Sequence, residues 1–157
     1  MKNDNQPLLR ELEKLLRGGT AHVGFEDAIA GIPEALLGEK PGNLPYSIWQ
    51  LVEHIRIAQA DMLDFCRNAD YKALNWPDDY WPKETAPTDS AEFERSVQAI
   101  QSDLEAFINL LQQGELYAAF PHGEGQTLLR EALQIADHTA YHVAEIVVIR
   151  RLLGAWK

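Results

Sequence analysis

The chain has 157 residues, of which 46% are hydrophobic and 24% are charged, and its formal net charge is -10. These values are typical of a globular protein and predict one domain over residues 1–157. The negative charge argues against partners such as nucleic acid or an anionic membrane surface, because both would repel the chain. The N-terminal segment resembles neither a signal peptide nor a membrane span, and the single cysteine, Cys66, suits the cytosol, so we expect a cytoplasmic protein.

Apolar residues recur at helical spacing along the chain, and this periodicity predicts an all-α fold without strands. A short amphipathic helix is expected over residues 7–17, and it ends at Gly18 and Gly19. Residues 25–29 can form a second short helix. The glycine and proline residues that follow predict an irregular connection up to Tyr46.

Ser47 is expected to begin a long helix that runs to about Arg67, because Ser47 and Gln50 match a capping box. The residues predicted to face the core are Leu51, His54, Ile55, Ala58, Met62 and Phe65. The residues predicted to face solvent are Glu53, Arg56, Gln59 and Asp64. His54 therefore occupies a core position in the second turn of this helix.

A connection over residues 68–87 is rich in tyrosine, tryptophan and proline. Irregular connections of this length are unusual and often pack over a site or a partner, although these aromatic residues could equally cover one end of the core. A third long helix is expected to follow, with Asp89 near its start and Gln113 near its end.

The last long helix is expected between Thr127, a suitable N-cap, and Gly154, which can end it. Its inward residues are predicted to be Leu128, Ala132, Ile135, Ala136, Thr139, Val143, Ile146 and Ile149. The helices most simply close as an antiparallel four-helix bundle with long connections, and the connection over residues 68–87 leaves room for another topology.

His138 and His142 lie one turn apart on or beside this inward stripe, with their side chains about 6 Å apart. Facing helices of a bundle bring core residues together, so His54 could supply a third imidazole. Three histidines and an open position are typical of a catalytic zinc-type site, whose bound water can act as a nucleophile or base or give way to a thiolate. Imidazole suits zinc, nickel, iron and copper alike.

Core packing is the competing interpretation of these histidines. A single buried histidine is more often a polar core residue that bonds to a nearby carbonyl or hydroxyl, and for His54 alone this interpretation is preferred. The pair His138 and His142 is different, because burying two imidazoles is costly unless something binds both. From spacing alone, both interpretations remain open.

Several polar residues could assist such a site. Glu145, one turn beyond His142, could be a fourth ligand, an acceptor that holds a histidine ring, or a solvated charge, and we favour the last two. Tyr141 could position a substrate or simply pack against another helix. Asp137 and Asp61 are weaker candidates for acceptors that hold a ring.

The remaining histidines and the cysteine are not expected to take part. His22 and His122 lie in glycine-rich segments and are predicted to be loop or surface residues. Cys66 is 12 residues from His54, about 18 Å along a helix, so the two cannot act together. Neither the Glu-x-x-His pattern of di-iron bundles nor the His-Glu-x-x-His pattern of zinc proteases is present, nor is a phosphate loop, a dinucleotide fingerprint or a Gly-x-Ser-x-Gly motif.

The segments 49–54 (WQLVEH), 137–142 (DHTAYH) and 148–152 (VIRRL) resemble the DinB-like superfamily, which includes proteins of the bacillithiol-transferase type. The resemblance covers most of the chain and is weakest over residues 20–46. It implies an up-down-down-up four-helix bundle, often a homodimer, with a divalent metal on the three histidines. Where relatives often carry glutamine, this chain has Glu145.

Two functions follow from the resemblance. In the first, a zinc, nickel or iron ion activates a thiol or water for transfer to, or hydrolysis of, a small electrophile. The thiol would be a low-molecular-weight compound, and the protein would be a thiol S-transferase or a hydrolase. In the second, the protein is a non-catalytic metal-binding or stress-related interaction protein that works as a dimer.

Overall fold

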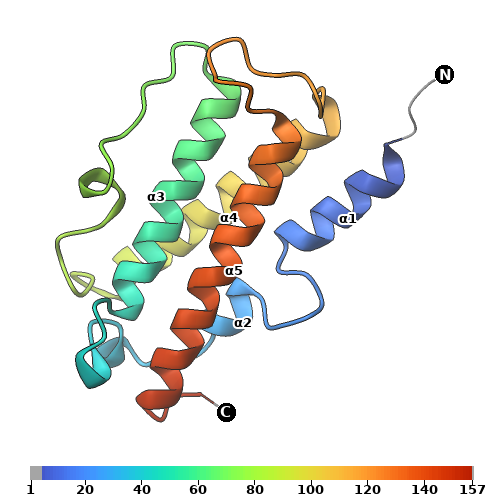
Figure 1. The fold of residues 1–157 in the computed structure, drawn as a ribbon. Helices are drawn as coiled ribbons and strands as arrows, with labels where there is room; N and C mark the ends of the chain where they lie inside the picture. The colour runs from blue at the N-terminus through green and yellow to red at the C-terminus, as the bar shows by residue number, and fades with distance from the viewer. Residues whose placement is uncertain (1–4, 157) are drawn as a thin grey trace.

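Four main helices pack together in the computed structural model, which describes residues 5–156 (Figure 1). They are α1 (Gln6–Leu16), α3 (Ile48–Arg67), α4 (Ser90–Gln113) and α5 (Leu128–Leu152). The connections contain the short helix α2 (Phe25–Ile29) and the 3₁₀ turns Glu34–Leu36, Pro41–Asn43 and Asp78–Tyr80. Within the described range, the β-structure consists of one isolated bridge, so the all-α prediction is confirmed.

The prediction that the N-terminal segment is neither a signal peptide nor a membrane span includes residues 1–4, which lie outside the described range. Among the described helices, none combines the length and the apolar character needed to cross a membrane.

Side chains and glycines set the helix ends as predicted. Ser47 Oγ accepts a hydrogen bond from Gln50 N, and Gln50 Oε1 accepts one from Ser47 N, both at 3.2 Å, so the capping box is present. The side chains of Asp89 and Thr127 cap α4 and α5 by accepting hydrogen bonds from Glu92 N and Arg130 N. Gly154 follows α5 with φ 68°, the left-handed conformation that glycine adopts without strain.

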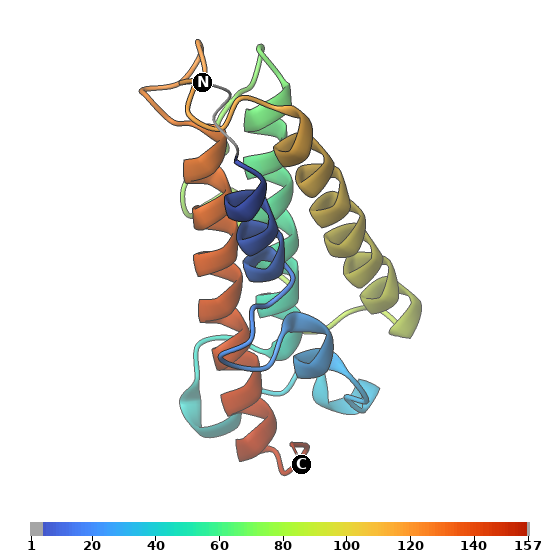
Figure 2. The same ribbon diagram turned by 90° about the vertical axis from the view of Figure 1, so that its right-hand side faces the viewer.

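The helices do not all alternate in direction. Figures 1 and 2 show that α3 and α4 run the same way, while α1 and α5 run the opposite way. The simple antiparallel bundle is therefore wrong at the α3–α4 step, where the connection over residues 68–89 returns along the whole bundle before α4 begins. The up-down-down-up order implied by the family resemblance is the one observed.

The core consists of two clusters stacked along the bundle. One lies toward α1 and includes Phe107 and Ile135, and the other lies toward α2 and includes Ile55 and Ile146. The segment of α5 that carries His138 and His142 lies between the two clusters.

Two predicted surface residues of α3 are buried instead. The exposed fraction is 2% for Gln59 and 8% for Glu53. Because α3 packs against both α4 and α5, its buried arc is wider than the single stripe expected from the sequence. Gln59 Nε2 donates to the Ile100 carbonyl of α4 at 2.6 Å, and Glu53 pairs with Arg56 at 2.8 Å.

Candidate metal centre

Three histidines from two helices converge inside the bundle. His54 lies in the second turn of α3, and His138 and His142 lie one turn apart on α5, which packs against α3. The Nε2 atoms of His54 and His138 are 3.0 Å apart, and one possible ligand atom from each of the three rings lies within 4.8 Å of the others. The group could therefore hold one metal ion.

Burial keeps these imidazoles neutral. His54 and His142 are buried, and His138 is half-buried. Desolvation, together with the neighbouring imidazoles, lowers the pKa of His138 and of His142 to about 4. Desolvation also lowers the pKa of His54. At neutral pH each ring therefore has a free lone pair, the form in which histidine binds metals.

Hydrogen bonds fix the proton of two rings on Nδ1. His54 Nδ1 lies 2.8 Å from the Tyr80 carbonyl oxygen, which only accepts, so Nδ1 carries the proton. His142 Nδ1 lies 2.6 Å from Glu145 Oε2 and donates to it in the same manner. The lone pairs of both rings are then on Nε2. Metal-binding histidines are usually held through the other ring nitrogen in this way.

The spacing of the nitrogens also fits an ion. Two nitrogens, each about 2.0–2.1 Å from a tetrahedral zinc ion, are about 3.3 Å apart. The observed 3.0 Å between the Nε2 atoms of His54 and His138 is close to this value, and it is also the distance of a hydrogen bond between the two rings. The residues present therefore fit a divalent metal held by three imidazoles.

The long connection between α3 and α4 covers the site. The ring of Trp81 stacks on His54 with centroids 3.8 Å apart and planes 3° from parallel. Tyr46 stacks on the other face of Trp81, with centroids 3.9 Å apart. Both interpretations of this connection hold, because it supplies the Tyr80 carbonyl and the indole that lie against His54, and Trp81 also packs against the core cluster that includes Ile55.

Asp61 fastens this connection to α3. Its two carboxylate oxygens accept hydrogen bonds from Tyr71 at 2.9 Å and from Tyr80 at 2.6 Å. Burial and the Asp61 carboxylate raise the pKa of Tyr71 to about 12 and also raise that of Tyr80. Further along, Ser47 Oγ donates to the Thr85 carbonyl at 2.5 Å. Asp61 thus contributes to the site through Tyr80, not by touching a histidine.

Glu145, Tyr141 and Asp137 lie at different positions around the histidine group. Glu145 holds the ring of His142, one of the two favoured roles, and the compact histidine group does not include it. Tyr141 is 66% exposed, and its ring meets His142 edge-on with centroids 5.0 Å apart. Asp137 is exposed, and its charge acts on the pKa of His138 only weakly, against the larger effects of burial.

His22, His122 and Cys66 are not part of the histidine group, as predicted. His22 and His122 are exposed in connections, and each bonds to a backbone carbonyl. Cys66 is buried, and desolvation raises the pKa of its thiol to about 12, so it is a poor nucleophile.

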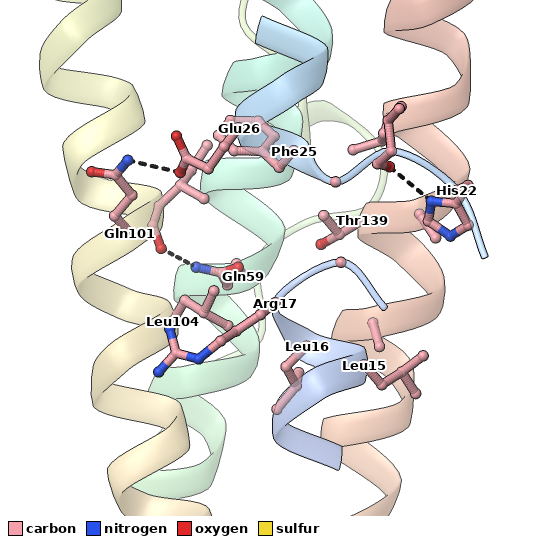
Figure 3. Close-up of a pocket in the computed structure, with 17 residues that line it drawn as sticks. Leu15, Leu16, Arg17, His22, Phe25, Glu26, Gln59, Gln101, Leu104 and Thr139 are labelled. Carbon is pink, nitrogen blue, oxygen red and sulfur yellow. Dashed lines mark hydrogen bonds between the residues drawn. The ribbon is translucent and has the colours of Figure 1, made fainter. Parts of the chain in front are cut away.

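A cavity of about 70 Å³, separate from the histidine group, lies between the main helices, and Figure 3 shows its lining. Its walls include Gln59, Thr139 and Leu104, and none of the three clustered histidines lines it. It is far smaller than the range of about 300–1,000 Å³ typical of small-molecule sites. This cavity is therefore a poor candidate for a small-molecule site.

Tyr80 and Trp81 belong to the aromatic connection expected from the sequence, but the sequence assigns no individual role to them or to Tyr46. The unusual length and aromatic content of residues 68–87 was the available signal for the first two. Nothing in the spacing of Tyr46, before α3, indicates that it stacks on a residue 35 positions later.

Neither the curated proteins nor the solved structures compared with this chain give a match. The family model described as DinB superfamily matches residues 20–146. This range contains the three histidines, Glu145 and the covering connection, and it spans more than half of the sequence. With its helical fold and its three-histidine group, the chain belongs to the DinB superfamily.

Proposed function

We propose that this protein is a metal-dependent enzyme that activates a thiol or a water molecule for attack on a small electrophile. One observation carries the proposal. His54 and His142 each have their Nδ1 engaged by an acceptor, so the lone pair of each ring is on Nε2, and one possible ligand atom from each of these rings and from His138 lies within 4.8 Å of the others. A hydrogen bond to a carbonyl would also hold a single core histidine, but three imidazoles clustered in the core are costly unless something binds them.

The chain's own residues have separate tasks in this function. A bound divalent cation would lower the pKa of a water or thiol at the open position. The Tyr80 carbonyl and the Glu145 carboxylate fix the rings of His54 and His142. Trp81 covers one face of His54 and excludes water from it. Imidazole donors fit zinc, nickel or iron, and a low-molecular-weight thiol is the proposed co-substrate.

A non-catalytic, homodimeric metal-binding protein is the second candidate, and an apolar groove between α1 and α5 supports its dimeric state. Leu15 and Leu133, 44% and 48% exposed, line a groove there together with Ala140. Apolar surface of this kind often marks a contact between proteins. Light scattering of the native protein and of a Leu133→Glu variant tests it, since a dimer built on this groove would dissociate in the variant.

Elemental analysis of protein purified without a histidine tag tests the metal site. We expect close to one divalent ion per chain, and its loss in His54→Ala and in His142→Ala. The exposed loop histidines offer matched controls, so His22→Ala and His122→Ala should retain the ion. Equal metal content in all four variants would show that the three histidines do not bind the ion.

Catalysis is tested by the consumption of small thiols in the presence of a panel of electrophiles, with hydrolysis of activated esters and amides measured in parallel. We expect activity that disappears on chelation and returns when the metal is restored. A metal-loaded protein that is inactive across the panel would favour the second candidate.

A further inference from the structure

A groove of about 360 Å³ lies one helical turn from the histidines, between the segment that enters α3 and the second half of α5. Its walls are largely apolar. The residues that line it are Leu44, Pro45, Tyr46, Leu51, Tyr141, Ala144, Glu145, Val148 and Ile149. Its volume lies within the range of about 300–1,000 Å³ typical of small-molecule sites.

The groove adjoins the histidine group through the side chains that hold it. Glu145 accepts the hydrogen bond from His142, and the ring of Tyr141 lies against the same imidazole. On the other wall, Tyr46 stacks on Trp81, which in turn stacks on His54. A molecule in the groove would therefore touch two residues that contact His142, and it would be separated from His54 by the stacked rings of Tyr46 and Trp81.

We propose that this groove binds the apolar group of the substrate, a single aryl ring or a short alkyl chain, next to the atom that reacts at the histidines. The inference rests on the proposed function, because it names the class of small molecule on which that site acts.

The charge of the groove favours an uncharged group. Glu145 is the one charged residue among those that line it, and its carboxylate is already engaged by His142. The neighbouring wall residues Ala144 and Val148 are small or aliphatic and offer only apolar contact. The stacked rings of Tyr46 and Trp81 restrict one wall, so little ordering is needed on binding.

Benzyl alcohol and ethanol test the groove directly, because they share a hydroxyl group and differ in the aryl ring. We expect benzyl alcohol to shift the backbone amide resonances of Ala144, Val148 and Leu44 in ¹⁵N-labelled protein, with saturation in the millimolar range. Ethanol should not do so at the same concentrations. In Ala144→Trp, whose indole would fill the groove from an exposed position on α5, the affinity should fall at least tenfold.

Ala91→Trp is the matched control, since Ala91 is exposed on α4 and does not line the groove. Its affinity for benzyl alcohol should equal that of the native protein. Shifts that do not saturate, or that persist in Ala144→Trp, would overturn the inference. So would a native dimer that Ala144→Trp dissociates, because a second copy would then occupy the groove.

The test separates this inference from the proposed function. The titration is run with metal-free and metal-loaded protein, and His54→Ala is included. If elemental analysis finds no metal but benzyl alcohol still binds as expected, the groove is supported as a binding site and metal-dependent catalysis is excluded. If the metal is present but benzyl alcohol gives no saturable shifts, the groove is excluded and the metal site stands.

Discussion

Removal of the Glu145 carboxylate should weaken metal binding, because this group fixes the His142 ring at 2.6 Å. A hydrogen bond to a charged group contributes about 1.5–3 kcal/mol, and loss of such a partner typically costs 10–100-fold in metal affinity. The Glu145 side chain is 36% exposed, so water can replace part of the interaction. We therefore expect the lower end of that range, about tenfold, in Glu145→Ala.

Competition with a chromophoric zinc chelator measures this affinity. Glu145→Gln keeps an oxygen acceptor without the charge, so its loss should be smaller, about threefold, since a neutral hydrogen bond contributes about half as much. Asp137→Asn is the matched control, because it removes an exposed carboxylate beside His138 on the same helix. An affinity in Glu145→Ala equal to that of Asp137→Asn would refute the reasoning about Glu145.

Three further predictions concern the loop, the pH dependence and the metal. Asp61→Ala should free the connection over residues 68–89, which would increase its cleavage by a protease and weaken metal binding several-fold; unchanged cleavage would contradict the role of Asp61. For metal-free protein, the pKa values of His138 and His142 lie near 4 when folded and near 6.5 when unfolded, so the unfolded chain binds more protons in this interval. The free energy of unfolding should therefore fall as the pH drops from about 6.5 to 4. Each histidine contributes up to about 1.4 kcal/mol per pH unit to this fall. Urea titrations should show a smaller fall in the double variant His138→Gln/His142→Gln. Zinc at 100 times its dissociation constant should raise the free energy of unfolding by about 2.7 kcal/mol, and an equal rise in His54→Ala would contradict binding at this site.

Much of the helical framework could be predicted from the sequence, because its signals are local. The caps at Ser47, Asp89 and Thr127 depend on residues three positions apart, and each is present in the structure. The convergence of the histidines could also be anticipated, since the spacing of His138 and His142 fixes one face of α5.

What could not be predicted depends on contacts between distant segments. A single inward stripe on α3 predicts that Gln59 is exposed, whereas Gln59 is buried because α3 is covered by two helices. Tyr80 approaches His54 only because the covering connection returns along the bundle, and Asp61 fixes that path. The same return path makes α3 and α4 parallel, which helical periodicity alone does not reveal.

X-ray absorption spectroscopy of the zinc-loaded protein tests the convergence of three imidazoles on one ion most directly. We expect three histidine nitrogens about 2.0–2.1 Å from zinc in the native protein. Two histidine nitrogens or fewer around the zinc ion would contradict the convergence of the three imidazoles.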